Sequence, residues 1–281
     1  MYSDDPQLKQ LQQICLEIMK SFTRFCDENG LTYYMCGGTL LGAIRHQGFI
    51  PWDDEVDLAM PREDYEKLLK IADRFNGDRY QIRHYSLNEE SSNAPMMQVV
   101  DTKATLLRQW TKKEKRIPVW IDVFPLDGMP RNKLLQKWHY YRYHICQYLM
   151  QISDKDNAIN IRRDRGFLQR IFIAFIFRSD LGKNWDKKKL LSKMDQILMK
   201  YPMDHSEMIS SFHGTLGKKE ILEGKWYNEK ALLPFEDGEY CAPKGYDAIM
   251  HHYYGDYMIP KRRNYEHDFA DLQIEEGKVI E

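Results

Sequence analysis

Apolar residues recur at helical spacing near the start of the chain. After Pro6, a residue favoured in the first turn of a helix, apolar side chains return every three or four positions as far as Phe25. The pair Asn29-Gly30 is a typical helix end, because both residues tolerate a left-handed backbone. The pattern therefore predicts one long N-terminal helix that packs on a sheet.

The stretches that follow predict a small mixed β-sheet. Short runs that alternate apolar and polar residues, or that are wholly apolar between glycines and prolines, are typical of strands. The predicted strands are residues 32–36, 55–60, 80–84, 97–108 and 119–124. Helices are expected at 39–44 and after Pro61, and residues 125–130 read as a turn.

The second half of the chain divides into a helical part and an aromatic-rich part. Helical spacing dominates from residue 132 to 201, and aromatic residues gather at 246–257. The polar stretch from Gln273 onward is expected to be a loose tail. We predict an α+β, nucleotidyltransferase-like fold: a small mixed sheet flanked by helices, with a helical insert. The predicted domains are a catalytic core at 1–130, the insert at 131–205, and a part at 206–281 that completes the catalytic domain.

Charge and cysteine content narrow the class of protein. The chain has 281 residues with 41 Lys plus Arg and 42 Asp plus Glu, a balance that argues against nucleic acid as a partner. The five cysteines are scattered and form no CxxC pair, which fits a reducing compartment. The N-terminus lacks a signal-peptide pattern, and no apolar run approaches the roughly 20 residues that span a bilayer. A cytoplasmic location is therefore expected.

The densest candidate chemistry is a set of carboxylates. Residues two apart in a strand share a face, so Glu55 and Asp57 are expected to point the same way, and Asp53 shares their parity. Asp122 sits in a short apolar strand that could lie beside them. Carboxylates held together repel one another, and Mg²⁺ relieves the repulsion while binding substrate phosphates. We therefore predict Mg²⁺, or Mn²⁺ in its place, bound by these four residues, with Glu55, Asp57 and Asp122 catalytic.

A glycine turn precedes these acids. Gly37-Gly38 would let the backbone approach a phosphate closely, and a helix that begins at Thr39 would present free amides and a hydroxyl to it. Taken singly, a glycine pair is often only a tight connection, and an acidic loop is often only a solvated turn. Their joint order, with an acid-apolar-acid-apolar strand after the helix, matches the signature of nucleotidyltransferase folds. This order favours a functional site over a purely structural turn.

At these residues the sequence resembles the LicD family, which is related to fukutin-type transferases. The matching blocks are Gly38–Asp57 continuing through Met60–Tyr65, then Ile121–Gly128, then Tyr254–Met258 with Pro260. Family members transfer phosphocholine from CDP-choline to cell-surface glycans such as lipopolysaccharide or teichoic acid. The resemblance implies a CDP-alcohol donor, a glycan or lipid-linked glycan acceptor, and release of CMP. The family commonly has aspartate where this chain has Glu55.

Six further residues are candidate substrate contacts. Arg45 and His46 follow the first short helix and would suit a phosphate, although basic residues also complement a helix C-terminus. Trp52 would stack on a base or on choline, unless it only packs. Asp256 would place the donor or the acceptor, or cap a turn. Arg262 and His267, in a basic cluster, would hold the nucleotide phosphate or form a solvated surface.

The segment 167–177 combines apolar residues with flanking arginines. Such a helix can lie on an anionic membrane, which suggests peripheral contact with the inner leaflet, or it can be buried within the insert. Two other functions also stay open at this point. One is a nucleotidyltransferase that adenylylates a small molecule or protein, and the other is a non-catalytic scaffold with the same fold.

Overall fold

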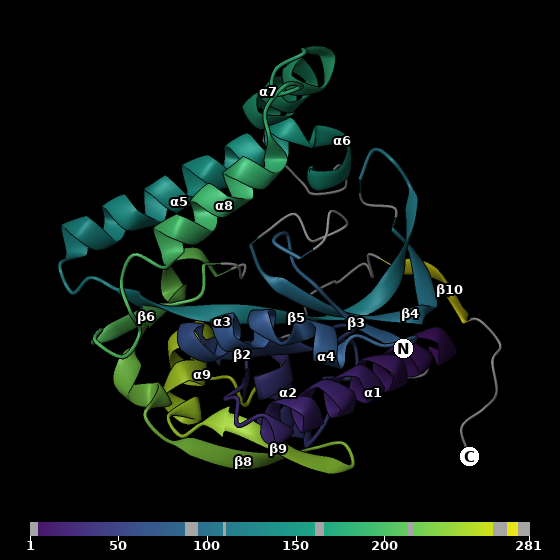
Figure 1. Ribbon diagram of the computed structural model, residues 1–281, viewed down its shortest axis with the longest axis vertical. Coiled ribbons are helices and arrows are strands. Elements are labelled where there is room, and N and C mark those ends of the chain that lie inside the picture. Colours follow the sequence, from purple (N-terminus) through teal and green to yellow (C-terminus); the bar gives the residue numbers. More distant parts are fainter. Residues whose placement is uncertain are drawn as a thin grey trace.

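The computed structural model describes residues 5–87, 95–108, 111–160, 166–212, 216–260 and 269–274. Figure 1 shows a curled sheet across the middle of the molecule. Helices α1 (Pro6–Glu28) and α2 (Gly37–His46) lie on one side of it with a two-stranded hairpin, and a second group of helices lies on the other side. The architecture confirms the predicted α+β fold class with a mixed sheet flanked by helices.

The N-terminal helix forms as its sequence predicts. Asp5 caps it, because its side chain accepts a hydrogen bond of 2.9 Å from the backbone N–H of Gln7, and Pro6 occupies the first turn. The apolar stripe of α1 is buried against the sheet, with Ile18, Met19 and Phe22 fully enclosed. The helix thus supplies one wall of the main hydrophobic core.

Within the described residues, eight strands form one sheet. Its main path runs β1-β2-β5-β4-β10, while β3 pairs with β4, and β6 connects β5 to β7. The strands are β1 (Tyr34–Met35), β2 (Asp57–Pro61), β3 (Tyr80–Arg83), β4 (Met97–Arg108), β5 (Lys115–Met129), β6 (Met208–Ser210), β7 (Ile221–Glu223) and β10 (Phe269–Ile274). Only the β2–β5 pair is parallel among these, so the sheet is mixed, as predicted.

Several predicted boundaries are wrong. The turn expected at 125–130 is strand, because β5 continues beside β2 as far as Pro61↔Leu126. Pro125 is tolerated there because the pairing of β5 with β4 ends at Val123, so its missing N–H breaks no bond to β4. Helix α2 begins at Gly37 rather than Thr39. Gln273 belongs to β10 rather than to a tail, and residues 275–281 lie outside the described part.

Helices dominate the stretch after the core, as the sequence predicts. They are α5 (Lys133–Ser153), α6 (Lys155–Ala158), α7 (Phe167–Arg178) and α8 (Lys187–Leu198). Helices α5 and α8 pack side by side along one edge of the molecule, and α7 lies beyond the C-terminal end of α5 (Figure 1). A second hydrophobic cluster, which includes Tyr143, Met194 and Phe212, fills the space beneath α5 and α8. The domain limits 1–130, 131–205 and 206–281 stay a prediction.

A buried ion-pair network joins this helical part to the sheet. Arg62, the first residue of α3 (Arg62–Lys70), donates two hydrogen bonds to Asp127 of β5, at 2.8 and 2.7 Å. It donates a third, of 2.9 Å, to Asp195 of α8. Tyr85 donates to the other oxygen of Asp195. All three charged residues are buried, so the network fixes α8 against the end of the sheet.

The remaining elements are one short helix near the middle of the sheet region and a group from the C-terminal part of the chain. They are α4 (Ala72–Phe75), two 3-10 helices (Gly217–Glu220 and Gly224–Tyr227), the hairpin of β8 (Lys230–Phe235) and β9 (Gly238–Pro243), and α9 (Tyr246–Tyr254). The aromatic-rich segment predicted at 246–257 contains α9, and its Tyr257 is buried. No helix in the described ranges is long and apolar enough to cross a membrane.

Candidate active site

The parallel pairing of β2 and β5 brings two predicted catalytic residues together. Asp57, the first residue of β2, is the register partner of Asp122 in β5. The N–H of Asp122 donates to the carbonyl of Val56 at 3.0 Å, so the pairing extends to the start of the strand. Glu55 precedes β2 rather than forming part of it, but among charged groups Asp57 has the largest effect on its pKa. The register therefore places carboxylates from two separate sequence blocks side by side on the sheet, where Asp122 influences the pKa of Asp57.

The glycine pair lies against this carboxylate cluster. A Cβ added at Gly37 would stand 2.9 Å from Oδ2 of Asp57, and one added at Gly38 would stand 2.6 Å from Oδ2 of Asp53. Gly37 also has a positive φ of 53°, a conformation that favours glycine. Asp53 and Asp57 therefore converge on the first turn of α2, and any side chain at either glycine would fill the space between them.

Thr39 makes a structural contact that was not predicted. Its side chain is buried, and its hydroxyl accepts a hydrogen bond of 2.8 Å from the backbone N–H of Asp57. The contact fixes the start of β2 relative to α2. Thr39 therefore positions a carboxylate, and its contact with a substrate stays a prediction.

Helix α1 secures the loop that carries Asp53. The side-chain amide of Gln12 donates to the carbonyl of Asp53 at 2.8 Å, and the N–H of Asp53 donates to the carbonyl of Ile50 at 2.8 Å. Trp52, in the same loop, is half-buried and packs against the main core. Its indole thus serves packing at least in part, and its predicted contact with a substrate is untested.

Burial raises the pKa of Asp53, Glu55, Asp57 and Asp122, and repulsion by neighbouring carboxylates adds to it for the first three. Desolvation, followed by the charge of Asp54, raises the pKa of Asp53 to about 7. Desolvation raises the pKa of Asp122 to about 6. The pKa of Asp57 is well above its ordinary value because of burial and the charges of Asp122 and Asp53. Glu55 is exposed at the rim, but the surrounding protein and Asp57 also raise its pKa. Within the described residues, no Lys or Arg side chain is among the causes of these pKa shifts.

The donor set of the cluster fits a hard dication. Carboxylate oxygens are the ligands that Mg²⁺ prefers, and a cation would relieve the repulsion that raises these pKa values. Across the described part of the chain, however, no three or more His, Cys, Asp or Glu side chains are arranged closely enough to hold a metal by themselves. Any metal held here would therefore need additional oxygen ligands, such as those of a phosphate or water.

Two residues beside Asp122 were not predicted from the sequence. The amide of Gln98 in β4 donates to Oδ1 of Asp122 at 2.9 Å. The side chain of Trp120 also hydrogen-bonds to Asp122, and both contacts lower the pKa that burial raises. Trp120 lies two residues before Asp122 on the same strand, and Gln98 is the register partner of Asp122. Strand parity was thus a signal that could have identified Trp120, whereas identifying Gln98 required the pairing of β4 with β5.

The other predicted contacts are spread over a wider surface. Arg45 donates to the carbonyl of Tyr257 at 3.0 Å, which ties α2 to the segment after α9. His46 lies beside it, and desolvation together with Arg45 lowers the pKa of His46. Asp256 is exposed, one residue from that contact. The structure thus brings Arg45, His46 and Asp256 to one region, whereas Arg262 and His267 lie outside the described residues.

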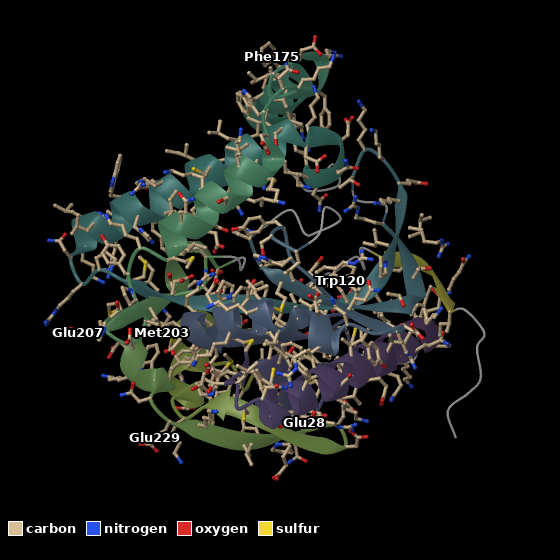
Figure 2. All side chains as sticks on the ribbon, viewed as in Figure 1. Glu28, Trp120, Phe175, Met203, Glu207 and Glu229 are labelled. Atoms are coloured by element: carbon tan, nitrogen blue, oxygen red, sulfur yellow. The ribbon has the colours of Figure 1, made fainter. Side chains whose placement is uncertain are left out.

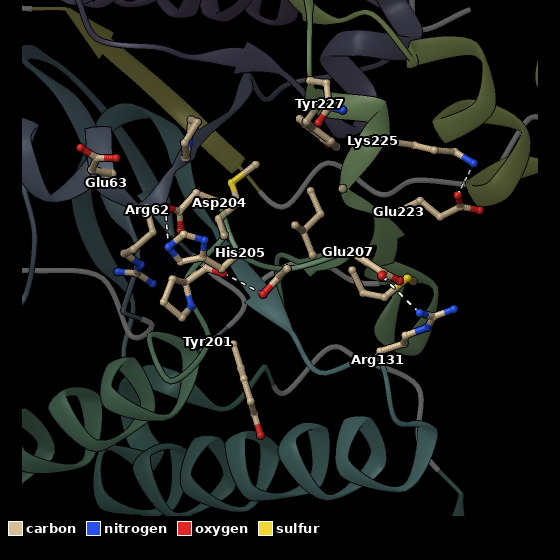
Figure 3. A pocket seen from close by; sticks show the side chains of 18 of the residues that line it. Arg62, Glu63, Arg131, Tyr201, Asp204, His205, Glu207, Glu223, Lys225 and Tyr227 are labelled. Carbon is tan, nitrogen blue, oxygen red and sulfur yellow. Dashed lines mark hydrogen bonds and ion pairs between the residues drawn. The ribbon is translucent and has the colours of Figure 1, made fainter.

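A large cavity lies at the opposite end of β2. It has a volume of about 1290 Å³ and is lined by Pro61, Arg62 and residues of the 199–209 and 223–228 segments. Figure 3 shows Arg131 paired with Glu207 and Lys225 paired with Glu223 at its wall. Asp57 stands at the start of β2 and Pro61 at its end, so this cavity is separate from the carboxylate cluster.

Comparison with known proteins agrees with the geometry. Residues 30–149 match the family described as LicD/FKTN/FKRP, nucleotidyltransferase domain. This range contains the glycine turn and the whole carboxylate cluster. Residues 30–149 therefore form a nucleotidyltransferase domain of the LicD type.

The similarity to one characterised relative extends far beyond that domain. The chain is 27% identical to the lipopolysaccharide cholinephosphotransferase LicD of Haemophilus influenzae, over 97% of this chain and 98% of that protein. It is also 41% identical to the human ribitol 5-phosphate transferase FKRP, but only over 54 residues, which are 18% of this chain and 11% of FKRP. The helical part and the C-terminal part thus have counterparts in the bacterial relative.

Proposed function

We propose that the protein transfers a phosphorylated alcohol, phosphocholine in the first instance, from a CDP-alcohol to a sugar hydroxyl of a cell-surface glycan precursor. The observation that carries the proposal is the pairing of Asp57 with Asp122 beside the Gly37-Gly38 turn, inside a LicD-family domain. The similarity to a cholinephosphotransferase over nearly the whole chain supports choline as the alcohol and lipopolysaccharide as the type of acceptor.

The proposed reaction is a substitution at phosphorus. The acceptor hydroxyl oxygen forms a bond to the phosphorus that carries the alcohol. The bond from that phosphorus to the bridging oxygen breaks, and CMP leaves with the bridging oxygen. The hydroxyl proton passes to Asp122 or a neighbouring carboxylate. Catalysis depends mainly on positioning and charge neutralisation, as in other phosphoryl transfers.

We further propose that Asp57, Asp122, Glu55 and Asp53 hold Mg²⁺, with Mn²⁺ as a substitute, together with the donor diphosphate. The cation would neutralise the charge of the diphosphate. Gly37 and Gly38 let the carboxylates of Asp57 and Asp53 approach the first turn of α2 closely. The N–H groups of that turn would favour a phosphate held beside them. Arg45, His46 and Asp256 would contact the outer parts of donor and acceptor. A cytoplasmic location and contact with the inner membrane leaflet belong to the same proposal.

The test is release of CMP by the purified protein. With CDP-choline, a lipopolysaccharide-type acceptor and Mg²⁺, we expect CMP and a choline-bearing glycan, and none of either after chelation. Asp57→Asn should abolish turnover without unfolding the protein. Glu229→Gln, the same chemical change at an exposed residue far from the cluster, should retain activity. Normal turnover by Asp57→Asn, or release of diphosphate from ATP in place of CMP from CDP-choline, would overturn the proposal.

A further inference from the structure

Helix α5 carries an apolar stripe on its outward face. Five large side chains recur there every three or four residues, and each is between 50% and 75% exposed. They are Leu134, Trp138, Tyr141, Ile145 and Tyr148. This spacing places all five along one side of the helix. Among the described residues, Lys218 reaches the stripe at Tyr141, whose hydroxyl accepts a hydrogen bond of 3.1 Å from its ammonium group. The five side chains nevertheless stay half exposed or more.

The opposite face of α5 already supplies the contacts that the fold needs. Gln136, His139, Tyr143 and Met150 are the buried residues of the helix, and they pack towards α8 and the second hydrophobic cluster. The helix is therefore apolar on two opposite sides. Because the inner side anchors the helix, the outer stripe has no part in holding the protein together.

Helix α7 adds a second exposed apolar surface. Phe167, Ile171, Phe172 and Phe175 are each more than half exposed, so the alternative that α7 is buried is wrong for most of the helix. Figure 2 shows Phe175 at the extremity of the molecule. The helix is nevertheless fastened at its C-terminus, because the ammonium group of Lys155 donates to the carbonyls of Ile176 and Ser179. It is thus presented outward on a fixed support.

The charges on both helices have one sign. Helix α5 contains Lys133, Lys137 and Arg142, helix α7 contains Arg170 and Arg178, and neither helix contains Asp or Glu. This contrasts with the whole chain, which has a net charge of −1. The ammonium of Lys218 also lies 4.8 Å from the ring centroid of Tyr141. By helical geometry, Lys137 and Arg142 flank the stripe on its two sides.

We propose that the α5 stripe and α7 together form a surface that binds an anionic lipid bilayer. Exposed Trp and Tyr beside basic residues are typical of helices that lie at a membrane interface, where apolar burial and attraction to acidic headgroups act together. The charge pattern favours this occupant over a second copy of the chain, because two such faces would bring like charges together. Binding to the bilayer does not depend on the proposed function. Only its suggested purpose does, which is to bring the enzyme to an acceptor carried on a lipid.

The test is flotation of the full chain with vesicles of phosphatidylcholine alone or mixed with phosphatidylglycerol. We expect binding only to the mixed vesicles, weakening as salt increases. The variants Trp138→Ser/Ile145→Ser and Phe172→Ser/Phe175→Ser should each reduce partitioning by about tenfold or more. Leu232→Ser removes an equally exposed apolar side chain from β8, away from both helices, and should bind as the unchanged protein does.

Several results would overturn the inference. One is failure of the unchanged protein to float with the acidic vesicles, and another is equal binding by the serine variants. Light scattering provides a third, because a dimer that dissociates in Trp138→Ser/Ile145→Ser would make the stripe an interface between copies. Transfer to a water-soluble acceptor fragment separates the two proposals: vesicle binding without any transfer sinks the proposed function alone, and transfer without vesicle binding sinks only the membrane surface.

Discussion

Replacing Arg62 by Met should destabilise the protein severely, because it leaves two buried carboxylates without their cation. In the intact network the guanidinium makes two hydrogen bonds to Asp127 and one to Asp195. The side chains of Arg62, Asp127 and Asp195 are 9%, 3% and 9% exposed, so water cannot take over these contacts. Methionine fills a similar volume, and the change therefore tests charge and hydrogen bonding rather than packing.

The expected loss is about 3–5 kcal/mol in the free energy of unfolding, the range found when one partner of a buried ion pair is removed. That is a large part of the roughly 5–15 kcal/mol that stabilises a typical domain. The variant Arg62→Lys keeps the positive charge but not the forked geometry of the guanidinium. Its free energy of unfolding should lie between those of the unchanged protein and Arg62→Met. Urea denaturation, monitored by circular dichroism, measures the free energy of unfolding of all three proteins.

The deficit of Arg62→Met should also depend on pH. Even with Arg62 present, burial raises the pKa of Asp127, and loss of the guanidinium raises it further. A carboxyl group with a raised folded-state pKa destabilises the protein once pH exceeds its unfolded value, and the penalty disappears as the group is protonated. The difference between the two proteins should therefore shrink on acidification. A loss below about 1 kcal/mol, or one that grows towards acid pH, would refute the ion-pair reasoning.

Two other changes probe the site and the helical part. Gly38→Ala should lower turnover by about a hundredfold with little loss of stability, since its Cβ would displace the Asp53 carboxylate; unchanged kcat and KM in the CMP-release assay would contradict the predicted role of the turn. Burial lowers the pKa of His139 to about 4, so the folded protein loses stability as pH falls from about 6.5 towards that value. His139→Phe should flatten this part of the stability profile by on the order of 3 kcal/mol, measured by denaturation at each pH, and an identical slope in both proteins would argue against a buried neutral imidazole.

The sequence predicted the parts of the fold that depend on local pattern. The N-terminal helix and β4 lie where periodicity and capping residues put them. The long β5 was underestimated, because its end is held by β2 and β6, which are distant in sequence, and Pro125 reads locally as a turn. Arg62 and Asp127 fall within the sequence blocks that resemble the LicD family, but the structure shows that they form a buried network with Asp195.

The candidate site, too, could be predicted where it depends on local pattern and not where it depends on the packing of distant segments. Alternation along one strand placed Asp57 correctly and indicated a partner on a neighbouring strand, which the register of β2 with β5 supplies as Asp122. It could not show that the Thr39 hydroxyl faces inward, or that Gln98 reaches Asp122, because both contacts depend on the three-dimensional packing of separate elements. The apolar stripe of α5 was also missed, since periodicity does not reveal which side of a two-faced helix is left uncovered.

The contact between Trp120 and Asp122 gives the protein a built-in optical probe. Indole emission responds to nearby charge, and this indole hydrogen-bonds to a carboxyl group predicted to ligate the cation. The chain has six tryptophans, so a version that keeps Trp120 and has phenylalanine at the other five would isolate the signal. Titration with Mg²⁺ and CDP-choline should then shift the emission of Trp120. Ligand binding could thereby be followed in real time without turnover, and a spectrum unmoved by either ligand would place their binding elsewhere.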